Sequence, residues 1–295
     1  MGVFVFENFQ HVQINVGEVT INARVGGNGK PLLLLHGYPQ THVMWHKVAP
    51  RLAQSFTVVA ADLRGYGDSG KPEGALDHSN YSKRALAYDQ VELMRQLGFE
   101  QFFLAGHDRG GRVAHRLAAD FPERVLKLAT LDISPTKKMY ESTHPEFARA
   151  YYHWFFFVQP RPLPEKLIGA NAQFFLLRHI GSRNAGLAPF TPEALNEYLR
   201  CFTPETIHGS CEDYRASASI DLEYDRADIA AGRKIVCPLL ALWGKHGTVE
   251  KCFAPVDDWR EVANDVRGHA LASGHYLAEE LPELVAGELE EFFGK

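Results

Sequence analysis

The segment Gly106-His-Asp-Arg-Gly110, in which two glycines frame an aspartate, constrains the fold more than any other feature of the chain. An apolar run, residues 101–105, precedes it, and residues 113–117 have a helical pattern. A strand that turns sharply into a helix through such a glycine-framed segment presents the central side chain at the tip of the turn. That residue is usually a serine nucleophile, whereas here it is Asp108. The pattern therefore predicts a strand–turn–helix unit that presents a carboxylate.

Apolar runs alternate with helical patterns on both sides of this turn. The runs expected as strands cover residues 12–16, 20–25, 31–35, 56–61, 101–105, 124–133, 238–244 and 266–272, and further helices are expected at residues 43–52, 81–97, 253–262 and 281–293. Continuous apolar runs such as 31–35 are typical of strands that are buried on both faces. The alternation therefore indicates an α/β fold with a mostly parallel central sheet flanked by helices.

The alternation stops between about Pro135 and Arg233. This stretch is rich in aromatic residues and prolines and contains no apolar strand pattern. An insertion between two strands of a parallel sheet lies over the carboxyl ends of the strands, where such sheets bind ligands. We therefore expect a core formed by residues 1–135 and 236–295, with a helical cap formed by residues 136–235.

Composition excludes several classes of partner. The net charge of −5 leaves no basic face for nucleic acid or anionic lipid. No apolar run reaches the ~18 residues of a membrane span, and the first residues lack the pattern of a signal peptide. The four cysteines form no C-x-x-C pair and are expected to be reduced thiols rather than metal ligands. We expect a cytoplasmic protein with no metal site, no nucleic-acid partner and no membrane partner.

Three candidate catalytic residues follow one another along the chain. Asp108 lies at the turn, Asp132 ends the next strand, and His275 precedes the last helix. Nucleophile, acid and histidine in this order are typical of hydrolases built on such a sheet. Glu250 is the next candidate for the acid, because residues 244–249 contain no carboxylate. His36 is expected to be a structural residue beneath the loop that follows it.

Over essentially its whole length the sequence resembles the α/β-hydrolase fold, and within that fold the haloacetate (fluoroacetate) dehalogenases. The matching stretches are His36-Gly-Tyr-Pro39, residues 62–69, Gly106–Arg112, Leu131–Thr136, the dipeptide His153-Trp154, and Cys211–Ala216. The resemblance implies hydrolytic dehalogenation of a small anionic haloacid, a homodimer, and no metal or organic cofactor.

An aspartate nucleophile suits displacement at a saturated carbon. A serine would form an ether, which water does not readily cleave, whereas a carboxylate forms an ester whose carbonyl water attacks. We therefore expect Asp108 to displace the halide, and His275, oriented by Asp132, to activate the water. The resemblance assigns the oxyanion hole to the backbone N–H groups of Tyr38 and Arg109.

The remaining candidate residues bind the two ends of the substrate. Arg109 and Arg112 lie in the first turn of the helix after Asp108, where cations oppose the helix dipole, and guanidinium groups suit a substrate carboxylate. By resemblance, a halide site is supplied by His153, Trp154 and Tyr214. The competing interpretation of Trp154 is core packing, because residues 151–157 are aromatic almost throughout.

Three alternative functions share parts of this pattern. An epoxide hydrolase uses the same aspartate and histidine but needs an acid, usually a cap tyrosine. The candidates for that acid are Tyr140, Tyr151, Tyr152, Tyr198 and Tyr214. A haloalkane dehalogenase usually has an indole where Arg109 stands. A non-catalytic binding module on this fold commonly lacks part of the triad, which is complete here.

Overall fold

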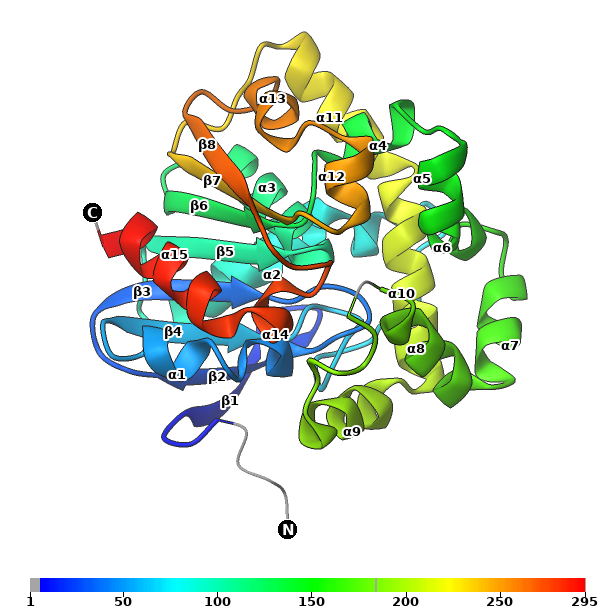
Figure 1. Ribbon diagram of the computed structural model, residues 1–295, viewed down its shortest axis with the longest axis horizontal. Coiled ribbons are helices and arrows are strands. Elements are labelled where there is room, and N and C mark those ends of the chain that lie inside the picture. Colours follow the sequence, from blue (N-terminus) through cyan, green and yellow to red (C-terminus); the bar gives the residue numbers. More distant parts are fainter. Residues whose placement is uncertain (1–5, 184, 295) are drawn as a thin grey trace.

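The computed structural model describes residues 6–183 and 185–294, and in them eight strands form one sheet (Figure 1). The strand order is β1-β2-β4-β3-β5-β6-β7-β8. Strand β2 runs antiparallel to β1 and β4, and all other neighbours are parallel. The strands are β1 (Gln10–Asn15), β2 (Thr20–Gly26), β3 (Lys30–Leu35), β4 (Phe56–Ala61), β5 (Phe102–His107), β6 (Val125–Leu131), β7 (Leu239–Gly244) and β8 (Val266–Leu271). The expected α/β class is therefore confirmed.

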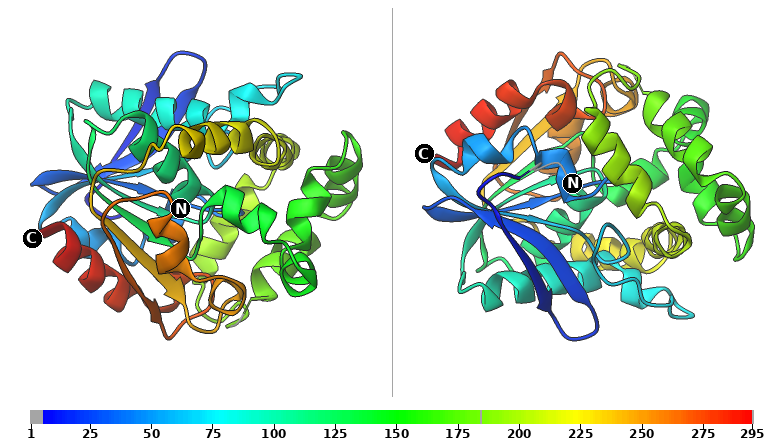
Figure 2. Two further views of the ribbon diagram at one scale, coloured as in Figure 1. Left: turned by 90° about the horizontal axis from the view of Figure 1, so that it is seen from above. Right: turned by 90° about the horizontal axis from the view of Figure 1, so that it is seen from below.

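Helices cover both faces of the sheet. Figure 2 shows α2 (Lys83–Gln96) and α3 (Arg109–Asp120) on one face, and α1 (Ala49–Leu52) and α15 (Pro282–Gly294) on the other. The remaining core helices are η1 (His42–Trp45), η2 (Ser79–Tyr81), α12 (Thr248–Cys252), α13 (Pro255–Arg260) and α14 (Leu277–Glu280). The four leucines of β3 are fully buried, as a strand covered on both faces requires.

Two expected helices are wrong in their extent. Residues 43–52 form the 3₁₀ turn η1 and the short helix α1 instead of one helix. Pro50 cannot donate a backbone hydrogen bond to the preceding turn, so the chain starts a new helix at Ala49. Residues 253–262 are helical only over α13, which begins at Pro255 for the same reason.

The chain between β6 and β7 is helical and lies beyond the carboxyl ends of the parallel strands, on the right of Figure 1. Its helices are α4 (Thr136–Glu141), α5 (Pro145–Ala150), α6 (Tyr152–Phe157), α7 (Leu163–Gly169), α8 (Ala172–Gly181), α9 (Pro192–Cys201), α10 (Pro204–Ser217) and α11 (Ile220–Ala230). We refer to residues 136–235 as the cap, and its status as a separate domain stays a prediction. Among the described helices, none is long and apolar enough to cross a membrane.

Candidate active site

Asp108 occupies a strained turn between β5 and α3. Its φ of 47° and ψ of −114° lie outside the regions that side chains other than glycine favour. The turn is also tight, since a Cβ atom at Gly106 would lie 2.4 Å from the carbonyl oxygen of Gly110. The two framing glycines thus allow the strand and helix to approach closely enough to hold Asp108 at the tip.

The Asp108 carboxylate faces the loop that follows β3. The backbone N–H of Tyr38 donates a 2.9 Å hydrogen bond to Asp108 Oδ1. Burial alone would raise the pKa of Asp108, but the charges of His275, His107 and Arg112 lower it overall. Asp108 is therefore ionised at neutral pH, as a nucleophile must be.

Asp132 and His275 form a direct pair. Nδ1 of His275 lies 2.6 Å from Asp132 Oδ2, and the backbone N–H of Gly244 donates to Asp132 Oδ1 at 2.9 Å. Both side chains are buried. Glu250, the alternative acid, accepts a hydrogen bond from the indole of Trp243 and is exposed. The geometry thus favours Asp132 as the partner of the histidine.

Arg109 is held by the cap helix α10. Its Nε donates to Asp213 Oδ2 at 2.7 Å, and its Nη2 donates to the backbone oxygen of Asp213 at 2.9 Å and to Ser217. Burial would lower the pKa of Arg109, but the Asp213 carboxylate raises it well above its usual value. Nη1 is buried without a hydrogen-bond partner among the described residues. One face of the guanidinium is therefore fixed, and one N–H is left to bind a ligand.

Arg112 differs from Arg109 because only neutral acceptors hold it. Its Nη1 donates to Ser134 O at 3.2 Å and to Thr136 Oγ1 at 3.0 Å. Its guanidinium carbon lies 4.6 Å from the centre of the Trp154 ring. In the described part of the chain, Nε is buried without a partner. Burial and the charge of Arg109 lower the pKa of Arg112, so an anion beside it would be strongly attracted.

The three expected halide-binding side chains lie close together on the cap. His153 and Trp154 are on α6, and their ring centres lie 5.6 Å and 6.3 Å from that of Tyr214 on α10. His153 Nδ1, Trp154 Nε1 and the Tyr214 hydroxyl are all buried without hydrogen-bond partners among the described residues. Burial lowers the pKa of His153 well below its usual value, so its imidazole is neutral. Three polar groups thus lie together unpaired in an aromatic surrounding.

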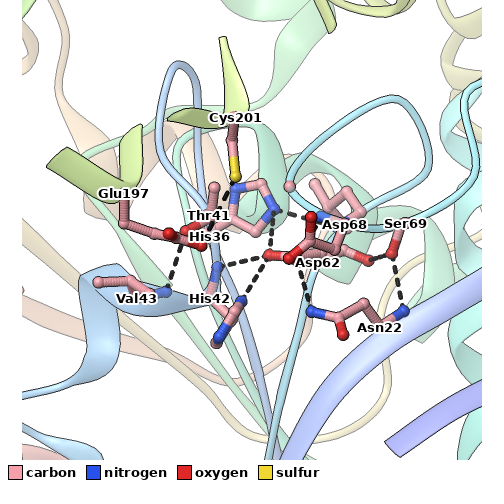
Figure 3. A network of polar contacts seen from close by, with 12 residues as sticks. Asn22, His36, Thr41, His42, Val43, Asp62, Asp68, Ser69, Glu197 and Cys201 are labelled. Atoms are coloured by element: carbon pink, nitrogen blue, oxygen red, sulfur yellow. Dashed lines mark hydrogen bonds and ion pairs between the residues drawn. The ribbon is translucent and has the colours of Figure 1, made fainter. Parts of the chain in front are cut away.

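A buried network around Asp62 supports the loop that carries Tyr38 (Figure 3). The Asp62 carboxylate accepts hydrogen bonds from the backbone N–H of His42 at 2.7 Å, from the His42 ring at 2.9 Å and from Asn22 Nδ2 at 2.8 Å. Burial would raise the pKa of Asp62, but the contacts with His42 lower it overall. The loop is therefore fixed by an ionised carboxylate beneath it.

His36 takes part in the same support (Figure 3). Its Nδ1 donates to the backbone oxygen of Gly37 at 3.0 Å, and its Nε2 accepts from the backbone N–H of Leu63 at 3.0 Å. Because both ring nitrogens are occupied by backbone groups, His36 has no free nitrogen for proton transfer. This arrangement favours the structural role that the sequence suggested for it.

Two groups of metal-ligand type lie on or beside the cap, outside the site. They are Asp68, Glu197 and Cys201, and Glu165, His208 and Glu212. In the first group Arg200 pairs with both carboxylates, and in the second Arg215 does so. These arginines already balance the carboxylates, so neither group calls for a cation.

Sequence reasoning missed two charged residues of the site, Asp213 and Arg183. Asp213 holds Arg109, and Arg183 stacks on Tyr151 at 4.8 Å. The only signal for Asp213 was its position beside Tyr214. Arg183 lies on the connection between α8 and α9, where no sequence pattern indicated its contact with Tyr151.

Comparisons with known proteins agree with this architecture. Residues 30–267 match the family model described as alpha/beta hydrolase fold. A solved α/β-hydrolase structure from Nostoc sp PCC 7120 is 55% identical, with a TM-score of 0.94 over 98% of this chain and 99% of that one.

Two curated relatives match over nearly their full length. A fluoroacetate dehalogenase from Burkholderia sp. is 50% identical over 97% of this chain and 94% of its own. A soluble epoxide hydrolase from Corynebacterium sp. (strain C12) is 34% identical over 96% of each chain. The family expected from the sequence is confirmed: the chain is a hydrolase of the α/β-hydrolase family and belongs with the haloacetate dehalogenases of that family.

Proposed function

We propose that this protein hydrolyses the carbon–halogen bond of short haloacids, converting fluoroacetate or chloroacetate to glycolate and halide. The observation that carries the proposal is a pair of buried guanidinium N–H groups, on Arg109 and Arg112, that have no hydrogen-bond partner among the described residues. Both belong to α3, in the turn directly after Asp108. Two such groups suit a carboxylate on the substrate. Binding of that carboxylate would place the α-carbon of the substrate near Asp108.

In the first step the Asp108 carboxylate attacks the α-carbon. A carbon–oxygen bond forms as the carbon–halogen bond breaks, and the halide leaves with the bonding electron pair. The product is a carboxymethyl ester of Asp108. The lowered pKa of Asp108 supports this step, because the carboxylate needs no base to become nucleophilic.

In the second step water cleaves the ester. His275 takes a proton from the water, and the hydroxide adds to the Asp108 carbonyl carbon. Asp132, 2.6 Å from Nδ1 of His275, fixes the tautomer and offsets the positive charge of the ring. The N–H of Tyr38, already 2.9 Å from Asp108 Oδ1, and the N–H of Arg109 hold the oxyanion. The intermediate then collapses as the bond from the Asp108 acyl carbon to the glycolate oxygen breaks, and that oxygen takes the proton from His275.

The departing halide is received by His153, Trp154 and Tyr214. Fluoride is small and strongly hydrated, so a buried site must supply donors in place of water. Each aimed donor in comparable oxyanion sites lowers a barrier by ~2.7–4 kcal/mol. The unpartnered polar atoms of these three residues support the assignment.

The epoxide hydrolase alternative needs a tyrosine that protonates an alkoxide. Tyr198 donates its hydroxyl to Glu279 at 2.6 Å, and Tyr152 is half exposed, so neither suits that role. The Tyr214 hydroxyl has no partner among the described residues, but its ring lies beside Arg109, with 4.0 Å between the guanidinium carbon and the ring centre. A site in which Arg109 Nη1 and Arg112 Nε are buried without partners among the described residues fits an anionic acid better than a neutral epoxide.

A direct assay tests the proposal. The protein is incubated with fluoroacetate, chloroacetate and a simple epoxide, and halide, glycolate and diol are measured. Halide and glycolate in equal amounts support it, whereas diol formation without halide release would replace it with epoxide hydrolysis. In His275→Asn, mass spectrometry after incubation with chloroacetate should find a carboxymethyl ester on the peptide that contains Asp108. A label elsewhere, or turnover by Asp108→Ala, would contradict the covalent mechanism.

A further inference from the structure

The cap contributes one more arginine to the site, Arg183, on the connection between α8 and α9. Its guanidinium carbon lies 4.8 Å from the centre of the Tyr151 ring. The Tyr151 ring centre lies 5.4 Å from that of His153 and 6.4 Å from that of His275. Tyr151 therefore lies between Arg183 on one side and His153 and His275 on the other, and joins Arg183 to the site.

Arg183 is a partly buried arginine, and no carboxylate among the described residues holds it. Its Nε is buried without a hydrogen-bond partner in the described part of the chain. By contrast, the Asp213 carboxylate lies 2.7 Å from Arg109, and Asp225 and Asp228 lie within 3.1 Å of Arg116. A guanidinium that leaves water without a counter-ion is costly, so such a group is a candidate for binding an anionic ligand.

The charge of Arg183 reaches the reacting groups. Burial would lower the pKa of Arg183, but Tyr151, Tyr276 and the Asp108 carboxylate raise it overall. After burial and His179, Arg183 is the next cause that lowers the pKa of His153. Its guanidinium is thus close enough to Asp108 and to the halide-binding histidine to influence both electrostatically.

The reaction itself requires this kind of charge. Asp108 is an anion and so is a haloacid, and the displacement brings the two carboxylates together around one carbon atom. Arg109 is already paired with Asp213, which leaves Arg112 and Arg183 as the two guanidinium groups of the site that have no carboxylate partner among the described residues. Two anions therefore meet two unpaired cations, one from the core and one from the cap.

We propose that Arg183 is a third substrate-binding guanidinium, supplied by the cap, which offsets the repulsion between the Asp108 carboxylate and the carboxylate of the substrate. The inference rests on the proposed haloacid substrate and adds to it a residue that selects for negative charge. Neutral α-halo compounds gain nothing from Arg183.

The test compares Arg183→Met, which keeps much of the bulk, with Arg183→Lys, which keeps the charge. With chloroacetate, KM should rise about tenfold in Arg183→Met, the scale of one hydrogen bond to a charged group, and Arg183→Lys should recover most of the loss. With chloroacetamide, all variants should behave alike. Arg178→Met, an exposed arginine of α8, is the matched control and should behave as the unmodified protein does.

Binding of the product glycolate, measured by calorimetry against neutral glycolamide, separates this inference from the proposed function. Glycolate affinity should fall about tenfold in Arg183→Met while glycolamide affinity is unchanged. If the unmodified protein releases no halide, the proposed function fails, and the glycolate titration still decides whether Arg183 binds the anion. Equal losses for charged and neutral ligands without recovery by lysine would show that Arg183 only packs against Tyr151, and would overturn the inference.

Discussion

Nδ1 of His275 lies 2.6 Å from the carboxylate of Asp132, and the backbone N–H of Gly244 holds the other oxygen of that carboxylate. The opposite ring nitrogen of the histidine takes no part in this pair, and the charge of the ring is the strongest influence that lowers the pKa of Asp108. Asp132 has a φ of 53°, a conformation that asparagine tolerates nearly as well as aspartate, so Asp132→Asn tests charge with little change of backbone.

Asp132→Asn should slow turnover of chloroacetate by about 10²- to 10⁴-fold, because a mispaired imidazole loses its working tautomer. The ester on Asp108 should accumulate, since only its hydrolysis needs His275. Rapid-quench mass spectrometry checks both points. Glu250→Gln is the control, and a large loss there with near-normal turnover in Asp132→Asn would transfer the acid role to Glu250.

Arg112→Leu should raise KM for haloacetates by about 10- to 100-fold, the range for a lost hydrogen bond to a charged group. Arg112→Lys keeps the charge but not the planar donor geometry, so its KM should lie between those of the unmodified protein and Arg112→Leu. Steady-state kinetics on chloroacetate measures the effect. Equal activity of the unmodified protein on neutral haloalkanes and haloacetates would refute binding of the carboxylate by these arginines.

Trp154→Phe keeps an aromatic ring and removes the indole N–H. Fluoroacetate turnover should fall about 100-fold, the value of one aimed donor, and bromoacetate turnover much less, because bromide leaves with a weaker bond and a more diffuse charge. Trp45→Phe, at another buried indole without a partner among the described residues, should show no dependence on the halogen. A uniform loss on both substrates in Trp154→Phe would mean that the residue only shapes the pocket.

Glu279 links the cap to the core and should make stability depend on pH. It accepts a hydrogen bond from Tyr198 at 2.6 Å and lies 3.2 Å from Lys47. Burial raises the pKa of Glu279 to about 7. The folded protein therefore binds a proton more tightly than the unfolded chain does, and this contribution to stability is lost as the pH rises from about 4.5 through about 7.

Glu279→Gln should remove that dependence, which amounts to about 3 kcal/mol at most. Thermal unfolding between pH 5 and 8 measures it, with Glu283→Gln, an exposed partner of Arg51, as the control. The unfolding temperature of the unmodified protein should fall over this interval. A rise, or the same dependence on pH in the unmodified protein and in Glu279→Gln, would contradict the assignment.

The elements of the core were predictable because each is specified locally. Continuous apolar runs such as Pro31–Leu35 mark strands that helices cover on both faces, and the glycine frame around Asp108 marks the turn. The errors arose at prolines. Pro50 lies in the first turn of α1 and Pro255 begins α13, and the hydrophobic pattern around each continued across the boundary.

The contacts between cap and core could not be predicted in the same way. Asp213 is 104 residues from Arg109 in the sequence, and nothing local distinguishes its carboxylate from an exposed one. Arg183 was missed for the same reason, since its contact with Tyr151 joins two separate segments of the cap. Motifs identify the groups that react, whereas the groups that orient them become visible only when distant segments are brought together.

The adjacency of Asp213 and Tyr214 on α10 has a consequence for redesign of the substrate range. Asp213 fixes Arg109, which binds the substrate carboxylate in the proposed mechanism, and Tyr214 is the residue proposed to bind the halide. The two residues that act on opposite ends of the proposed substrate are therefore neighbours in the sequence. A shift of α10 that admits a larger halogen would also displace Arg109. Directed evolution toward bulkier leaving groups should keep α10 unchanged and accumulate its useful substitutions on α6 and on the connection around Arg183.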